Sequence, residues 1–242
     1  MVKTNTKKLA TALSKIQAKL GIKAKQNTNI KIHNYYNYGN SSTGYFAKMI
    51  PILLAFFVFF FVFLISGMAL LKERMTGTLD RLLATPVRRS DIVWGYLLSY
   101  GFIAILQTLV IVFTTIWLLN VEVVGNIWLI VLVNLVVALV ALTFGFLMST
   151  FASSEFQMMQ FIPLVVMPQI FFSGIIPLSS MASWVQVIGK FLPVTYAGNA
   201  LTGIILKGAD LSTIAGDLGM LMIFLVVFLI LNILGLKRYR KV

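Results

Sequence analysis

The sequence of 242 residues contains no cysteine, and its only histidine is His33. Without cysteine the chain has no disulfide, no thiolate nucleophile and no cysteine-ligated metal, and one imidazole does not make a histidine-based metal centre. Charge is also scarce: 11% of the residues are charged, whereas 59% are hydrophobic and the mean hydropathy is +0.93. A soluble domain of this size could not bury so much apolar side chain, because its surface must remain in water. The composition therefore indicates a membrane protein.

Five apolar segments are long enough to cross a bilayer at about 1.5 Å per residue. Pro163 and Pro168 interrupt the fourth segment, so we expect a broken helix there that packs against other helices rather than against lipid. The sequence thus predicts an all-α membrane protein with spans at residues 49–71, 92–119, 127–151, 158–176 and 217–236.

Basic residues beyond position 48 cluster in the loop between the first two spans and in the tail after the fifth. They are Lys72, Arg74, Arg81, Arg88 and Arg89 in the loop, and Lys237, Arg238, Arg240 and Lys241 in the tail. Cytoplasmic segments of membrane proteins are enriched in Lys and Arg, and five spans put the loop and the tail on the same side. We therefore expect a multi-pass protein of the cell membrane whose loop 72–91 and C-terminus are cytoplasmic.

Residues 1–48 do not fit the orientation that five spans predict. They hold nine lysines and no acidic residue, and they contain no apolar stretch typical of a signal peptide, yet five spans place them outside the cell. Either this segment is cytoplasmic and the number of spans differs by one, or a further segment precedes it.

The interiors of the predicted spans contain no Asp, Glu, Lys, Arg or His. Self-powered transporters and proton relays rely on ionisable groups at membrane depth, and an intramembrane hydrolase needs an activated nucleophile. The sequence also lacks a GxxxxGK[ST] loop for ATP. We therefore expect no catalytic residue, metal or cofactor in this chain, and any uphill transport must draw its energy from a partner.

The predicted spans contain uncharged polar residues, which have two interpretations. They either form hydrogen bonds between helices or line a path for an amphipathic substrate. A path of Phe, Met, Leu and a few amides suits a hydrophobic compound or a lipid better than an ion. The candidate path residues are Gln107, Asn134, Gln160, Gln169 and Ser173.

The stretch LLKERMTGTLDRLLATPVRRSD, residues 70–91, is dense in charge and lies between two apolar runs. Its leucines recur at i, i+3 and i+4, the spacing of one face of a short helix: Leu79, Leu82 and Leu83. The residue before Pro86 is biased away from helical geometry, so we expect this helix to end there and Ser90 to cap the next span. Taken alone, such a loop is typical of a topology signal with an interfacial helix.

The run LLKERMTGTLDRLLATPVRRSDIVWGYLLSY resembles the first cytoplasmic loop of type-2 ABC transporter permeases, the membrane subunits of drug, antibiotic and polysaccharide exporters. The pattern in that family, (R/K)ER–x–x–GTL(E/D)–x–LL–x–TP, is met here by Lys72, Glu73, Arg74, Gly77, Thr78, Leu79, Asp80, Leu82, Leu83, Thr85 and Pro86. FASSEFQMMQFIPLVVMPQIFFSGIIPL resembles the second cytoplasmic turn and the helix after it. WVQVIGKFLPVTYAGNALTGIIL is similar to the re-entrant external hairpin, so the resemblance covers about residues 45–242.

The resemblance implies that the charged loop is a coupling helix, which docks on a separate ATPase subunit and passes its movement to the membrane helices. An exposed leucine face would supply contact area, and the charges would supply orientation. The implied docking residues are Glu73, Arg74, Gly77, Thr78, Leu79, Asp80, Arg81, Leu82, Leu83, Pro86, Arg88 and Arg89. Glu155 would make a smaller second contact, with a solvated loop carboxylate as the alternative.

The same resemblance implies an assembly. Two permease chains, identical or different, would form a dimer in the lipid bilayer with two ATPase subunits, which would use ATP and magnesium. The permease itself would be no enzyme, would bind no nucleic acid, and would export a hydrophobic or amphipathic compound such as a drug, an antibiotic or a lipid. The alternatives are a secondary transporter or channel, which would show flux without ATP, and a membrane assembly protein without an ATPase partner.

Members of that family usually have six spans and an external domain between the first two. We therefore expect this sequence to begin inside the external domain, with residues 1–48 as its remnant and 49–242 as the transmembrane domain. Apolar spacing predicts a helix over residues 5–20 and a strand over 29–38.

After the fourth span, four apolar residues recur at helical spacing: Trp184, Val187, Ile188 and Phe191. Pro193 follows them, so we expect a short external helix at the membrane interface. Its functional interpretation is a gate over the exit path. Gly198 and Gly203 suit close packing across a dimer axis.

Overall fold

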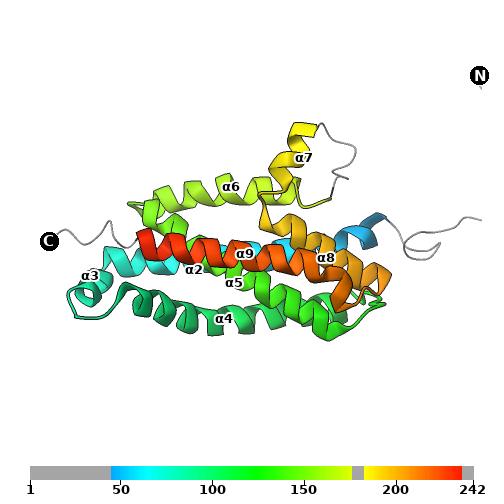
Figure 1. Ribbon diagram of the computed structural model, residues 1–242, viewed down its shortest axis with the longest axis horizontal. Coiled ribbons are helices and arrows are strands. Elements are labelled where there is room, and N and C mark those ends of the chain that lie inside the picture. The colour runs from blue at the N-terminus through cyan, green and yellow to red at the C-terminus, as the bar shows by residue number, and fades with distance from the viewer. Residues whose placement is uncertain (1–44, 176–182, 236–242) are drawn as a thin grey trace, which may run out of the picture. The chain divides into compact units, whose positions relative to one another are not determined.

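The computed structural model describes residues 45–175 and 183–235, and the regular elements in these ranges are α-helices. In chain order they are α2 (Tyr45–Met75), α3 (Thr78–Leu83), α4 (Arg89–Leu118), α5 (Ile127–Phe151), α6 (Glu155–Phe171), α7 (Ser183–Gly189), α8 (Pro193–Lys207) and α9 (Leu211–Gly235). Figure 1 shows α2, α4, α5 and α9 running lengthwise along the bundle. The helix expected over 5–20, the strand expected over 29–38 and the basic tail lie outside the described residues.

Four of the described helices are long and apolar enough to cross a membrane. They cover Met49–Met75, Ser90–Leu118, Ile127–Phe151 and Leu211–Gly235, which match the first, second, third and fifth predicted spans. The prediction of an all-α membrane protein is therefore confirmed.

The expected fourth span, 158–176, is not one of these four helices. α6 has 17 residues, which cover roughly 25 Å at the rise of an α-helix, less than the hydrocarbon core of a bilayer. Pro163 and Pro168 lie inside α6 without breaking it, because each proline removes one backbone hydrogen bond and the adjoining turns keep theirs. One face of α6 buries Met158, while Phe156 is 71% exposed. The prediction of a broken helix covered by its neighbours was wrong.

Two hydrogen bonds join the end of α6 to the start of α8. The side chain of Gln169 near the end of α6 accepts a hydrogen bond from the Val194 N–H in the first turn of α8, at 3.2 Å. Thr195 Oγ1 in the same turn donates to the Phe172 carbonyl at 2.8 Å. With α6 and α8 joined in this way, α9 ends at the same end of the bundle as α3, as Figure 1 shows.

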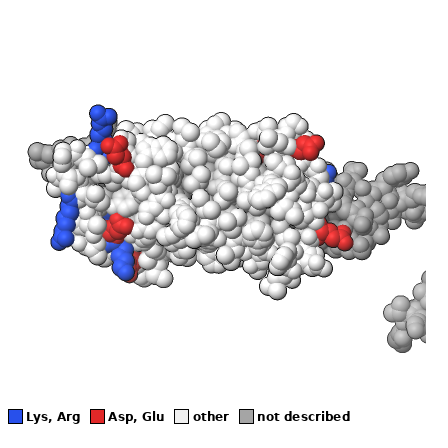
Figure 2. All heavy atoms as spheres, turned by 90° about the horizontal axis from the view of Figure 1, so that it is seen from below, with Lys and Arg blue, Asp and Glu red and all other residues white. Residues whose placement is uncertain are grey.

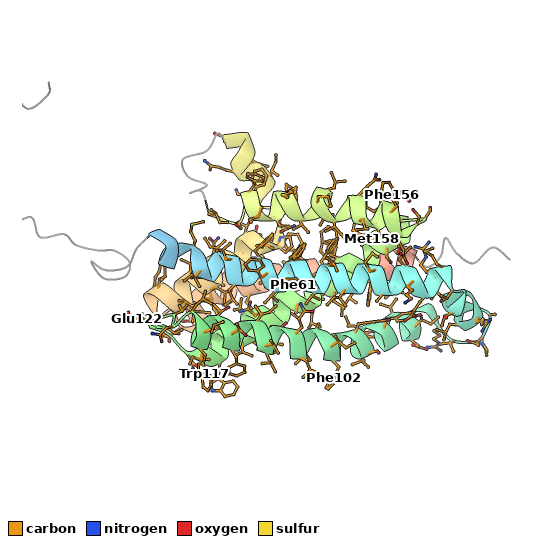
Figure 3. All side chains as sticks on the ribbon, turned by 180° about the vertical axis from the view of Figure 1, so that it is seen from behind. Phe61, Phe102, Trp117, Glu122, Phe156 and Met158 are labelled. Atoms are coloured by element: carbon orange, nitrogen blue, oxygen red, sulfur yellow. The ribbon has the colours of Figure 1, made fainter. Side chains whose placement is uncertain are left out.

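α2 and α5 form the centre of the bundle. Of the most apolar stretch of α2 and of α5, 61% is buried inside the protein, compared with 22% for α4 and 17% for α9. A Cβ on Gly145 of α5 would lie 2.7 Å from the Phe63 carbonyl oxygen and 3.0 Å from the Gly67 nitrogen of α2. The two backbones are therefore in direct contact, which is how small residues join helices in a membrane. Met158 of α6 points toward α2 beside this crossing (Figure 3).

α9 and α4 both pack on α5 and also contact each other, through Leu229 and Ile233 of α9 beside Ile92 and Val93 of α4. The ring of Phe228 in α9 stacks on Phe144 of α5 with centroids 4.6 Å apart, and Asn232 Nδ2 donates to the Thr143 carbonyl at 2.8 Å. The outer face of α4 is apolar and exposed, and Figure 3 shows Phe102 and Trp117 directed away from the bundle. Such a face suits contact with lipid rather than water.

Charged side chains gather at the two ends of the bundle and leave an uncharged belt between them (Figure 2). The described charged side chains at the α3 end are four basic residues, Lys72, Arg74, Arg81 and Arg88, and three acidic ones, Glu73, Asp91 and Glu155. One acidic residue departs from the sequence-based expectation. α9 begins at Leu211, so Asp217 lies in its second turn and not at the margin of the span.

Gly198 and Gly203 do not lie on a surface that a second chain could reach. Both are buried in α8. A Cβ on Gly198 would lie 2.8 Å from the Ser173 carbonyl, and one on Gly203 would lie 3.4 Å from Ala209 Cβ. The expectation that they pack across a dimer axis was wrong, because their small size serves contacts within the chain.

Gly145→Ala should lower the apparent melting temperature of the purified protein in detergent. The added methyl group collides with backbone atoms of α2, and overpacking of this kind costs about 1–3 kcal/mol. Gly219→Ala in α9 is the matched control, because nothing lies within 4 Å of its Cβ position and alanine favours an exposed helix. Equal melting temperatures for the two variants would contradict the backbone contact between α2 and α5.

Candidate functional site

The charged loop begins as a continuation of α2. Thr76 Oγ1 donates to the carbonyls of Lys72 and Glu73, at 3.0 and 3.2 Å, and closes the last turn. Gly77 then takes φ +75°, a conformation that costs glycine little and other residues more. The chain thus turns within two residues, and α3 follows α2 directly.

α3 is the expected short helix, but its leucines do not share one exposed face. Leu79 is buried, at 1% exposure, in a cluster with Ile92 and Val93 of α4. Leu82 and Arg81 are exposed. The expectation that Leu79 belongs to an exposed docking face was wrong, because this leucine anchors α3 to the bundle. The side chains of Asp80, Leu83 and Arg89 lie outside what the structure describes.

The end of α3 and the start of α4 differ in how well they were predicted. Thr85 Oγ1 donates to the Leu82 carbonyl at 2.6 Å, and the helix stops before Pro86 as expected. α4 begins at Arg89, with Arg88 in the capping position. Ser90 lies within the helix and donates to Asp91 Oδ1 at 3.2 Å. Its predicted role as the N-cap was therefore wrong, since the extended capping residue is Arg88, two residues earlier than the capping signal suggested.

Arg74 connects the charged loop to the turn between α5 and α6. Its Nη1 donates to the carbonyl of Ser149 and, at 3.2 Å, to the carbonyl of Ala152. These carbonyls belong to the end of α5, where the last turn of a helix lacks partners for its C=O groups. A cation at this position also interacts favourably with the helix dipole. The side chain that sequence resemblance places in docking therefore holds two segments of the same chain together.

The turn between α5 and α6 has its own cap. Ser154 Oγ accepts a hydrogen bond from the Gln157 N–H at 3.2 Å, and Gln157 Oε1 accepts from the Ser153 N–H at 2.8 Å. Such reciprocal bonds fix a helix start. Glu155 is exposed in the first turn of α6, at the end of the bundle that carries α3. Its second contact with a partner stays a prediction.

Glu73 faces inward to α4 rather than outward. Tyr100 Oη donates to Glu73 Oε1 at 2.5 Å. Both residues line a pocket of about 270 Å³ beneath α3, together with Leu82, Asp91 and Tyr96. Sequence reasoning missed the two tyrosines, although their i, i+4 spacing on α4 places them on one face. In the described part of the chain, no group of three His, Asp or Glu residues could hold a metal.

Three of the five candidate path residues make hydrogen bonds of a structural kind. Asn134 Nδ2 donates to the Ile130 carbonyl, and Ser173 Oγ donates to the Ile170 carbonyl, both at 2.8 Å. Gln169 joins α6 to α8. All three side chains are buried, but only the Gln169 bond joins two helices, and Asn134 Oδ1 has no hydrogen-bond partner in the structure. The interpretation as a bond between helices is therefore supported for Gln169 alone.

Gln107 and Gln160 have different surroundings. Gln160 is exposed on α6. Gln107 lines a cavity of about 10 Å³ beside Ser66 and Tyr100, and its buried Nε2 has no hydrogen-bond partner in the structure. That volume suits a single water molecule. The structure does not bring the five residues together, and their role in a substrate path stays a prediction.

A family model described as "ABC-2 family transporter protein" matches residues 2–234 of the chain. The sequence is 32% identical over 194 residues to ABC transporter G family member 20 of Dictyostelium discoideum, covering 78% of this chain and 27% of that protein. It is 25% identical over 198 residues to the probable multidrug ABC transporter permease YbhR of Escherichia coli (strain K12), covering 81% and 53% respectively.

The linearmycin resistance permease protein LnrN of Bacillus subtilis (strain 168) is 31% identical over 172 residues, which cover 70% of this chain and 44% of LnrN. The chain thus spans between about a quarter and a half of the length of these curated relatives.

Arg74→Ala should destabilise the protein, whereas Arg81→Ala should not. Removal of the Arg74 guanidinium leaves carbonyls at the end of α5 without their donor, and the Ser149 residue is buried. Loss of a partner from such a group costs about 1–3 kcal/mol. Arg81 is exposed at the same end and carries the same charge. Thermal unfolding in detergent measures both, and equal effects would show that Arg74 does not hold α5.

Proposed function

Because the chain belongs to the ABC-2 family of transporter proteins, we propose that it is the membrane subunit of an exporter driven by ATP hydrolysis in a separate subunit. The observation that carries this proposal is the placement of α3. Its buried Leu79 fixes it to α4, while Arg81 is exposed and Leu82 is exposed at the rim of the pocket beneath α3. A helix that is anchored by one side chain and exposes its neighbours suits docking of a partner.

The connections of α3 suit the transfer of movement into the membrane. α2 leads into α3 through Thr76 and Gly77 alone, Leu79 packs on α4, and Arg74 binds the end of α5. A displacement of α3 by a partner therefore acts on three long helices at once. In this proposal the ATPase supplies the energy, α3 transmits the movement, and the long helices form the route for the cargo.

The proposed cargo is a hydrophobic or amphipathic compound. The bundle interior consists of apolar side chains with a few amides and hydroxyls, which match such a compound better than an ion. LnrN is named as a linearmycin resistance permease and YbhR as a probable multidrug permease. Two permease chains in the cell membrane, identical or different, would act with two ATPase subunits.

We further infer that α3 and the end of α9 face the cytoplasm. Basic residues prevail at the α3 end, and cytoplasmic loops are enriched in Lys and Arg.

Leu82→Asp should remove association with the ATPase subunit while membrane insertion is retained. Leu82 is exposed on α3, and a carboxylate in an apolar contact is costly to desolvate. Co-purification of an ATP-binding subunit with a C-terminally tagged chain measures this, and we expect a decrease of at least about tenfold, equivalent to 1.4 kcal/mol. Leu211→Asp makes the same change at an exposed position of the other end and should not affect association. Undiminished co-purification of the ATP-binding subunit with the Leu82→Asp variant would contradict the docking of α3 on the ATPase.

Cysteine labelling tests the orientation, and the absence of native cysteine makes single-cysteine variants clean. Thr85 and Glu122 are exposed at opposite ends of α4. In intact cells a membrane-impermeant maleimide should label Glu122→Cys, and it should label Thr85→Cys only after permeabilisation. The reverse pattern would overturn the proposed topology.

A further inference from the structure

The pocket beneath α3 has the volume of a small-molecule site and a distinct chemistry. It lies between the last turn of α2, the helix α3 and the first three turns of α4, and its volume is about 270 Å³. That is close to the lower limit for pockets that bind small organic molecules. The pocket is open to one side, so a ligand can enter without unfolding the loop.

Two carboxylates line the pocket at different depths. Asp91 lies in the first turn of α4, and Glu73 is bonded to Tyr100, nine residues further along α4. These nine residues correspond to about 13 Å along the helix. Among the described side chains, the donors bonded to the two carboxylates are the hydroxyls of Tyr100 and Ser90, with that of Tyr96 beside Glu73, and a hydroxyl carries no charge that would neutralise them. The pocket is therefore negative inside, although the surrounding end of the bundle is basic.

The remaining walls are apolar and aromatic. Leu82, Val87 and Ile92 contribute aliphatic surface. Tyr96 and Tyr100 stack with ring centroids 6.2 Å apart and also face the pocket. An aromatic face attracts a cation by its quadrupole, and this attraction adds to that of a carboxylate. The Tyr96 hydroxyl also lies beside Glu73, so the aromatic wall and this carboxylate border the same part of the pocket.

We propose that this pocket binds an amphipathic organic cation. Its charged group lies between Glu73 and Asp91, and its apolar body lies against Val87 and Ile92. An anion is repelled by the carboxylates, and an inorganic cation leaves the aliphatic walls and most of the volume unused. In naming a class of cargo, the inference rests on the proposed function. The binding chemistry itself requires no ATPase.

Ethidium is a suitable probe, because it is an aromatic cation whose fluorescence rises in an apolar site. The full chain, purified in an uncharged detergent, should bind ethidium saturably. Glu73→Gln combined with Asp91→Asn should raise the Kd on the order of tenfold, because the attraction of the half-buried Glu73 carboxylate and the exposed Asp91 carboxylate is lost. Glu122→Gln combined with Asp210→Asn removes the same charge from exposed positions at the other end and should leave the Kd unchanged.

Gly95→Leu provides a second variant that does not alter charge. Gly95 lines the pocket, and its Cβ position has nothing within 4 Å, so a side chain can start there without meeting a neighbour. Leucine occupies pocket volume and also favours the helix. We expect loss of saturable ethidium binding with an unchanged melting temperature. The anionic dye 8-anilinonaphthalene-1-sulfonate, which also fluoresces in apolar sites, should show no dependence on either pocket variant.

The outcomes separate this inference from the proposed function. Equal ethidium affinity for wild type and both pocket variants would overturn the inference, as would stronger binding of the anionic dye. Loss of ATPase association in the carboxylate variant with unchanged ethidium binding would assign the pocket to the partner, and would overturn it too. If the wild type binds ethidium as described but brings down no ATPase, the cation site stands and the exporter proposal fails.

Competition identifies the source of the cation. Displacement of ethidium by octylammonium but not by octanoate supports a free amphipathic compound. Displacement by phosphatidylethanolamine but not by phosphatidylcholine supports a lipid ammonium group as the natural occupant. Absence of competition by any amine would contradict the cation site.

Discussion

At Gly145 the carbonyl oxygen of α2 residue Phe63 lies 2.7 Å from the place where a Cβ would stand, so α2 and α5 touch along their backbones. Within a bilayer, lipid tails are as apolar as leucine, and close van der Waals contact therefore decides which helices associate. The neighbouring helices build on this pair. α6 places Met158 against Gly67, α9 stacks Phe228 on Phe144, and α4 is bonded to α2 through the tyrosine–glutamate pair.

This arrangement gives the residues of the charged loop different tasks, although the sequence presents them as one motif. Leu79 packs inward on α4, Arg74 binds the end of α5, and Glu73 lines the pocket with Tyr100. Of the described side chains in α3, Thr78, Arg81 and Leu82 remain exposed to meet a partner. Anchoring and docking residues are thus close neighbours on a six-residue helix, with Leu79 buried and Leu82 at the edge of the same face, which explains how a short loop could act as a firm connection.

The sequence was sufficient to predict four long helices and the short helix before Pro86, because uninterrupted apolar runs and a proline stop are local signals. The sequence was insufficient to predict features that depend on packing between helices. The course of α6 through Pro163 and Pro168, the burial of Leu79 and the internal contacts of Gly198 depend on neighbouring helices that no local pattern reveals. The pocket was missed for the same reason, since Glu73 and Tyr96 come from different helices and meet only in the fold.

Docking of α3 on an ATPase is tested most directly by site-specific photo-crosslinking in native membranes, with a photoreactive amino acid at position 82 and, in a separate variant, at position 79. Leu82 is exposed and Leu79 is buried. We expect position 82 to crosslink to an ATP-binding subunit that mass spectrometry identifies, and position 79 to crosslink only within the chain. Crosslinks from position 82 to lipid alone, with no ATP-binding subunit, would contradict the docking of α3.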